Sequence, residues 1–164
     1  MKKFELTSEF VTFLGKKLFR IKALVSFGDV KEGELGGLVE KEENLDQSGN
    51  AWVYGNARVS GDARVSGDAR VYGNAWVSGN AWVSGDARVQ NCRDYSATSC
   101  FGSENRTTTF FRTKDGGISV RCGCFYGTLA EFREKVKERH GGRRLAKEYL
   151  MLADLMEFRL SKDE

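Results

Sequence analysis

Residues 49–89 read GNAWVYGNARVSGDARVSGDARVYGNAWVSGNAWVSGDARV, a six-residue unit that repeats with almost no drift. In every unit an alanine precedes a valine by two positions, and Gly followed by Asn or Asp ends the unit. Side chains alternate faces along a strand, so Ala and Val are expected inside and Trp, Arg, Tyr or Ser outside. The Gly-Asn and Gly-Asp pairs supply tight bends. One unit cannot bury its own Ala and Val, so the units must coil and stack as a parallel β-helix.

The exchanges among the outward residues predict how many units make one coil. Tyr54 and Tyr72 lie 18 residues apart, which is three units. At this spacing the Trp and Arg residues share the columns Trp52–Arg70–Arg88, Arg58–Trp76 and Arg64–Trp82. Neighbouring coils lie about 4.8 Å apart, so a guanidinium can stack on an indole in each column. A two-unit coil leaves Tyr54 without its partner, and the spacing therefore favours three sides.

The segment before the repeat, residues 1–44, predicts a β hairpin and a loop. Apolar and polar residues alternate in two blocks within residues 4–27, with a turn at Gly15-Lys16-Lys17. Residues 28–39 are rich in Gly and are expected to form a loop. The charged residues 40–44 are expected to be a hinge into the repeat.

The hexapeptide β-helix is expected over residues 45–90, and a small α+β cap over residues 91–164. Residues 91–106 are polar and rich in Ser and Thr, which indicates a connector. Residues 107–122 predict a second hairpin, because Asp115-Gly116 is a typical hairpin turn.

Two helices are predicted to complete the cap. Thr128 and Glu131 form a capping box that begins a helix ending near His140, and two glycines follow it. A second helix is predicted over about residues 143–160 from its apolar stripe.

Composition limits the setting of the protein. The net charge of +3 gives no global field that requires a nucleic-acid partner. The N-terminus, MKKFELTSEF, lacks the apolar region of a signal peptide, and no apolar run is long enough to span a bilayer. We therefore expect a cytoplasmic protein of a bacterial host cell with no membrane partner, whose cysteines stay reduced.

The units V-S-G-D-A-R resemble the hexapeptide pattern of left-handed β-helix proteins. The stretch FGDVKEGELGGLVEKEENLDQSGNAWV is similar to the entry of hexapeptide proteins loosely grouped with acetyltransferases, and TTFFRTKDGGISVRCGCFYGTLAEF resembles a C-terminal module of phage and prophage proteins. The resemblance implies three-sided coils, a homotrimer and a phage-type setting. The expected fold is mainly β: a short three-sided left-handed parallel β-helix between an N-terminal hairpin and a C-terminal α+β cap.

Catalytic and metal chemistry find little support in the residues. The resembled acyltransferases use a histidine base on or near the coils, whereas the single histidine here, His140, is expected at a helix end. We therefore predict no catalytic residue, although acyl transfer remains the alternative activity. Cys122-x-Cys124, with Cys92 and Cys100, has an atypical spacing for zinc, so neither a metal nor a cofactor is expected.

Cationic and aromatic residues are the candidate ligand-binding set. On the repeat they are Tyr54, Arg58, Arg64, Arg70, Tyr72, Trp76 and Trp82; on the cap they are Arg143 and Arg144, at the start of the second helix. Such side chains stack on bases and bind phosphates, and helix N-terminal amides bind anions. Alternatively the repeat residues form a self-stacking ladder or the interface of a trimer, and Arg143 and Arg144 are a solvated surface.

The function predicted from these observations is non-enzymatic. The best hypothesis is a phage counter-defence factor that sequesters a small anionic signal such as a nucleotide, or blocks a host protein. The alternatives are an acyltransferase-like enzyme and a structural or assembly oligomer.

Overall fold

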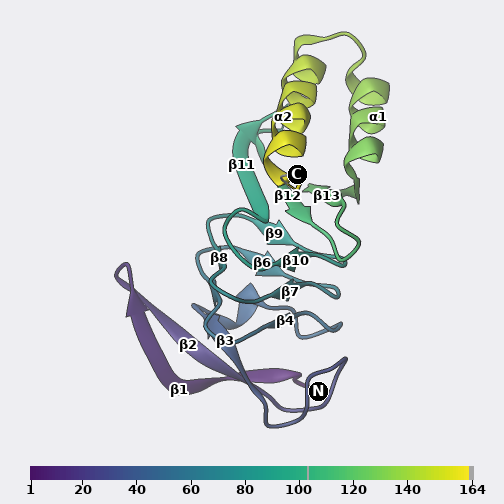
Figure 1. The fold of residues 1–164 in the computed structure, drawn as a ribbon. Coiled ribbons are helices and arrows are strands. Elements are labelled where there is room, and N and C mark those ends of the chain that lie inside the picture. Colours follow the sequence, from purple (N-terminus) through teal and green to yellow (C-terminus); the bar gives the residue numbers. More distant parts are fainter. Residues whose placement is uncertain (103, 163–164) are drawn as a thin grey trace.

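The computed structural model describes residues 1–102 and 104–162. Figure 1 shows three parts in chain order: a β sheet at the N-terminal end, a stack of short strands in the middle, and a sheet with two helices at the other end. No helix in the described ranges is long and apolar enough to cross a membrane.

The repeat forms a β-solenoid of two-residue strands. These strands are β4 (Trp52–Val53), β5 (Arg58–Val59), β6 (Arg64–Val65), β7 (Arg70–Val71), β8 (Trp76–Val77), β9 (Trp82–Val83) and β10 (Arg88–Val89). Every pairing between them is parallel and joins residues 18 positions apart, in the orders β4-β7-β10, β5-β8 and β6-β9. This confirms the predicted columns, including Arg58 beside Trp76 and Arg64 beside Trp82.

The core of the solenoid consists of the repeating alanines and valines, all of them buried as predicted. Backbone N–H groups of one coil donate to carbonyls of the next, as from Trp52 to Ala69 and from Arg70 to Ala87. At the corners, Gly61 and Gly67 have φ of +65° and +68°, a conformation that suits glycine because it has no Cβ. The sequence pattern and the backbone geometry therefore agree throughout the repeat.

The N-terminal hairpin is present, but its sheet is larger than predicted. Strands β1 (Phe4–Phe13) and β2 (Lys16–Ala23) pair antiparallel, and β3 (Leu35–Val39) joins β2 to the solenoid strand β5. The expectation of a loop over residues 28–39 is wrong for β3. Gly36 and Gly37 are there for close packing, since a Cβ at Gly36 would lie 2.6 Å from side-chain atoms of Ile21 and Trp52.

Trp52 corrects the prediction that all three tryptophans point to the outside. Its side chain is fully buried, with the Phe4 and Phe27 rings 6.2 and 5.3 Å from its own, both edge to face. The N-terminal segment covers the outer face of the first coil, and Phe4 and Trp52 belong to one core cluster with the repeat. Hairpin and solenoid therefore share a hydrophobic core.

Two side chains replace the missing coil below the first one. The Lys3 ammonium donates to the carbonyls of Gly49 and Ala51, at 3.4 and 2.9 Å. The Asn44 amide, in the 3-10 helix η1 (Glu42–Asn44), donates to the carbonyls of Gly61 and Ala63, at 3.0 and 2.8 Å. These carbonyls would otherwise be buried without partners, which is costly.

Burial of Lys3 predicts a pH dependence of stability. Desolvation lowers its pKa from 10.5 to about 8, although Asp46 acts in the opposite sense. Between these two values the unfolded chain holds a proton that the folded chain has lost, so the free energy of unfolding should rise with pH. We expect the native chain to gain about 1 kcal/mol or less per pH unit relative to Lys3→Met.

Urea unfolding at several values between pH 8 and about 9.5 checks this expectation and stays below the range in which tyrosines titrate. Equal slopes for the native chain and for Lys3→Met would contradict it.

The C-terminal cap is a four-stranded antiparallel sheet with two helices. Its elements are β11 (Tyr95–Phe101), β12 (Arg106–Arg112), β13 (Ile118–Cys122), β14 (Phe125–Thr128), α1 (Leu129–His140) and α2 (Arg144–Leu160). The predicted hairpin and both helices are present, and Thr128 makes the expected capping box with Glu131. The cap is therefore more than a hairpin with two helices.

The prediction of a connector over residues 91–106 is wrong for β11, because β11 is a polar edge strand that pairs with β12. Tyr95 fixes its start, because the phenol donates to the carbonyl of Trp76 at 2.6 Å. Phe111 of β12 joins the solenoid core, whereas Phe110 on the other face joins the helices. Both ends of the solenoid are thus covered by sequence outside the repeat.

Candidate functional site

The β4-β7-β10 face brings several of the predicted ligand-binding residues together. Tyr54, Arg70, Tyr72 and Arg88 line a hollow of about 340 Å³ on this face. The arginines lie on β7 and β10, one directly above the other, and the tyrosines follow β4 and β7 at the equivalent position of their units. All four side chains are partly exposed. The 18-residue coil therefore creates the hollow by placing like residues in register.

Charges around this hollow are unequal. Asp29 accepts from the Tyr54 hydroxyl at 3.1 Å and pairs with Arg70 at 2.9 Å. Arg88 donates to backbone carbonyls of Asp68, Asp86 and Ala87. Two guanidiniums thus lie beside the carboxylate of Asp29, and the more distant carboxylate of Glu34 also acts on Tyr54.

Tyr54 is held neutral beside these charges. Burial raises its pKa to about 12, with Arg70 acting in the opposite direction. The phenol therefore stays protonated and keeps its hydrogen to donate over the ordinary pH range. A neutral phenol next to two guanidiniums is suited to a ligand that carries both a ring and negative charge.

On the second face, formed by β5 and β8, the predicted ligand-binding residues Arg58 and Trp76 already contact other side chains of the protein. The Arg58 guanidinium lies 4.1 Å from the centre of the Phe13 ring, and Phe13 packs edge to face on Trp76 at 5.0 Å. The Trp76 indole N–H donates to the Ser60 hydroxyl at 2.8 Å. Phe13 comes from the end of β1, so the N-terminal hairpin reaches across this face and stacks on the column.

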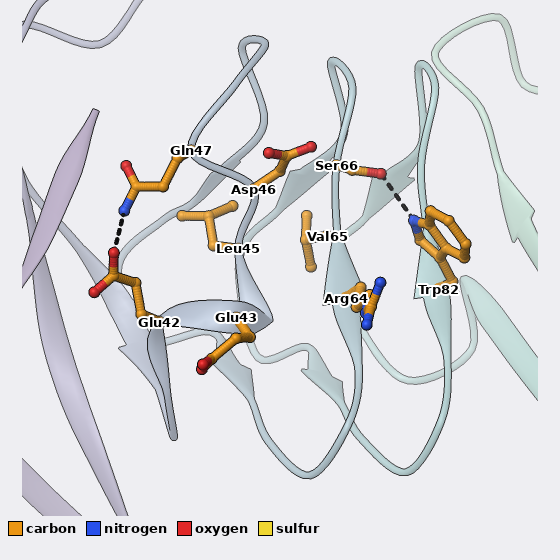
Figure 2. A pocket seen from close by; sticks show the side chains of 9 residues that line it. All are labelled: Glu42, Glu43, Leu45, Asp46, Gln47, Arg64, Val65, Ser66 and Trp82. Carbon is orange, nitrogen blue, oxygen red and sulfur yellow. Dashed lines mark hydrogen bonds between the residues drawn. The ribbon is translucent and has the colours of Figure 1, made fainter. Parts of the chain in front are cut away.

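The third face carries a larger cavity of about 610 Å³, drawn in Figure 2. Arg64, Ser66 and Trp82 lie on the repeat side, and the Trp82 indole donates to Ser66 at 2.9 Å. The opposite side, from η1 and the first residues of the coil, includes Glu42, Glu43, Leu45, Asp46 and Gln47. The lining holds three carboxylates and one guanidinium, and Glu42 also pairs with Lys2 at 3.0 Å. The remaining excess of carboxylates disfavours an anion in this cavity.

Trp82 also contacts residues of the C-terminal cap. The Arg121 guanidinium of β13 lies 3.6 Å from the indole centre, and the Arg64 guanidinium lies 5.8 Å from it. The backbone N–H of Trp82 donates to the Thr109 hydroxyl at 3.0 Å. Trp82 therefore joins the solenoid to the cap, and cations already lie at its ring.

Arg143 and Arg144 lie apart from these faces. Arg143 is the N-cap residue of α2 and Arg144 the first residue of the helix, in the turn after α1 at the end of the cap remote from the solenoid (Figure 1). Both are exposed, and Arg144 approaches Glu148 at 3.8 Å. The structure does not bring these two residues together with the arginines of the repeat.

Sequence reasoning omitted Arg88, Asp29 and Arg121 from the candidate set. Arg88 could have been predicted from the sequence, because it lies 18 residues after Arg70 and shares its column. Asp29 and Arg121 carry no comparable signal, since each arrives from a segment outside the repeat.

His140 and the cysteines are placed away from the hollow. The His140 ring stacks at 5.8 Å on Tyr149, whose pKa is raised mainly by burial. Cys92, Cys100 and Cys124 are exposed, while Cys122 is half-buried and accepts from the Thr108 hydroxyl at 3.2 Å. Within residues 1–102 and 104–162, no three His, Cys, Asp or Glu side chains are grouped to hold a metal.

Comparison with known proteins supports the reading of the repeat. Residues 51–67, 63–79 and 69–85 match the model of the YdcK beta solenoid repeat. No curated protein matches the chain. The repeat is therefore of the β-solenoid type, in agreement with its parallel strands and buried Ala and Val columns.

Proposed function

We propose that this protein is a non-enzymatic binding protein that holds a small anionic ligand of the nucleotide class. The observation that carries the proposal is the hollow on the β4-β7-β10 face, lined by Tyr54, Arg70, Tyr72 and Arg88. Of the cavities described above, it combines two guanidiniums with two phenol rings, and only the carboxylate of Asp29 is in direct contact with its lining. It also contains three of the residues that the sequence pattern predicts for ligand binding.

Each side chain of the hollow has a separate part in the proposed binding. The guanidiniums of Arg70 and Arg88 bind phosphate oxygens through paired, charge-assisted hydrogen bonds. The rings of Tyr54 and Tyr72 stack on a base, an interaction that tolerates different bases. Asp29 positions Arg70 and competes with the ligand for it, because its carboxylate lies 2.9 Å from that guanidinium.

The wider setting of the proposal follows the family resemblance. The three strand columns 18 residues apart support a three-sided coil, and we propose the left-handed sense and the trimer that the resembled hexapeptide proteins have. In the proposed role, the protein acts in the cytoplasm of a phage-infected bacterium and sequesters a nucleotide signal of the host defence.

Placement of His140 supports the non-enzymatic form of the proposal over acyl transfer. The imidazole lies at the end of α1 against Tyr149, in the cap rather than on a solenoid face. An acyltransferase would instead bind acetyl-CoA and lose turnover in His140→Ala. Absence of acetyl-CoA binding at about millimolar concentration, the upper end of the typical range of KM values, would remove that alternative.

Isothermal titration calorimetry against cyclic and linear nucleotides tests the proposal. At low ionic strength, where surface charges are least screened, we expect saturable binding to at least one nucleotide. Arg70→Gln and Arg88→Gln should each weaken it by about tenfold or more, which corresponds to one lost charge-assisted hydrogen bond. Asp29→Asn should strengthen it, because a competing carboxylate is removed. Arg64→Gln, on the acidic third face, is the matched control and should bind normally.

No heat with any nucleotide would overturn the nucleotide proposal, and the blocking of a host protein or an assembly role would then take its place. Equal weakening by Arg64→Gln and Arg70→Gln would show that binding depends on net charge rather than on this hollow.

A further inference from the structure

Helix α2 exposes an apolar stripe on the side opposite its buried face. Met151, Leu155 and Phe158 are 72%, 56% and 82% exposed. They lie at positions i, i+4 and i+7 and therefore share one face of the helix. The buried residues of α2, which include Tyr149, Ala153 and Met156, pack on the cap. The exposed stripe is thus additional to the apolar residues that the cap core requires.

The spacing of this stripe is that of a coiled-coil seam. Met151, Leu155 and Phe158 take the d, a and d positions of a heptad, and Asp154 and Arg159 then take the g and e positions beside them. In a parallel pair of such helices, the g residue of one copy faces the e residue of the following heptad in the other copy. Asp154 of one copy therefore faces Arg159 of the next, and the charges are opposite.

Both flanking residues are exposed and positioned for this contact. Asp154 accepts from Arg133 at 2.8 Å, and its side chain is still 73% exposed. Arg159 makes a long contact of 3.4 Å to the carbonyl of Cys92.

We propose that copies of this chain associate side by side through α2, with their α2 helices parallel and the Met151–Leu155–Phe158 stripe at the contact. The inference deepens the homo-oligomeric part of the proposed function by assigning its surface, and it does not depend on the ligand. Apolar side chains of this size lose water on association, and the complementary flanks select the parallel register.

Light scattering after size exclusion tests the contact with full-length chains. The native chain should have a mass that is a multiple of the 18.4 kDa chain, three times for a trimer. Leu155→Asp should be a monomer with an unchanged circular dichroism spectrum. Leu14→Asp, at the hairpin tip, makes the same chemical change at a site 72% exposed and should remain oligomeric. A monomeric native chain, or an oligomeric Leu155→Asp, would overturn the proposal.

A charge exchange tests the parallel register. Asp154→Arg and Arg159→Asp should each shift the oligomer toward monomer, and the double variant should restore it. Rescue is the informative readout, because Asp154→Arg also loses the Arg133 pair and the second change does not restore that pair. No rescue would contradict the parallel arrangement. Calorimetry on the native chain and on Leu155→Asp keeps the two proposals distinct. Nucleotide binding by a native chain that is monomeric would contradict this contact alone, and a native oligomer that binds no nucleotide would contradict the hollow alone.

Discussion

Replacing Val65 by Asn is expected to lower the free energy of unfolding by about 3–5 kcal/mol, whereas replacing its neighbour Arg64 by Asn should leave stability nearly unchanged. Val65 is fully buried, and its neighbours in the column are Leu45 and Val83. A buried amide between two apolar side chains has no hydrogen-bond partner. The cost is about 3–5 kcal/mol, a large part of the stability of a small domain.

Arg64 is exposed on the same two-residue strand, so Arg64→Asn should change the free energy of unfolding by about 0.5 kcal/mol or less. Urea unfolding followed by circular dichroism measures both variants. Effects of similar size would mean that adjacent residues do not alternate between the inside and the outside of the coil.

Trp52→Ala is expected to cost about 3–5 kcal/mol, the range for large aromatic residues removed from a core. Trp52 is fully buried against Phe4 and Phe27, although its repeat position faces outward. Trp76 and Trp82 occupy the same position of their units and are only partly buried. Alanine at either of them should therefore cost less than at Trp52.

The three alanine variants form an internal comparison, because the same residue is removed from three units of one repeat. Thermal or urea unfolding of each gives the order directly. If Trp52→Ala cost no more than Trp76→Ala, the N-terminal sheet would not cover the first coil in solution.

The repeat could be predicted in detail because each unit carries its whole signal within six residues. The Ala and Val positions specify the core, the Gly-Asn and Gly-Asp positions specify the corners, and the Trp–Arg exchanges specify an 18-residue register that the strand pairing confirms. The helices of the cap are similarly local, since Thr128 and Glu131 begin α1 through contacts three residues apart.

What could not be predicted depends on residues distant in the sequence. Gly36 and Gly37 suggest a loop, because glycine is typical of loops. Within β3, however, Gly36 leaves room for the side chains of Ile21 and Trp52, and both of these residues are distant in the sequence. β11 carries few apolar side chains, and its place in the sheet depends on its pairing with β12 and on the contact of Tyr95 with the solenoid.

The candidate site likewise contains residues that the repeat predicts and residues that it does not predict. The column of Arg70 and Arg88 follows from the repeat alone. The repeat alone does not predict the partners of the other outward residues, because each partner comes from a flanking segment. These partners are Phe13 on Arg58, Arg121 on Trp82 and Asp29 on Arg70. The outward residues of the three faces look equivalent in the sequence, and the flanking segments make them different.

Native mass spectrometry of the full-length chain, mixed with the nucleotide panel and compared with Arg70→Gln, tests the central claim most directly. We predict an oligomer of the native chain that carries one nucleotide per chain, and an oligomer of Arg70→Gln that carries much less at the same nucleotide concentration. An oligomer without any nucleotide, or the same nucleotide content in both chains, would contradict binding in the hollow of Tyr54, Arg70, Tyr72 and Arg88.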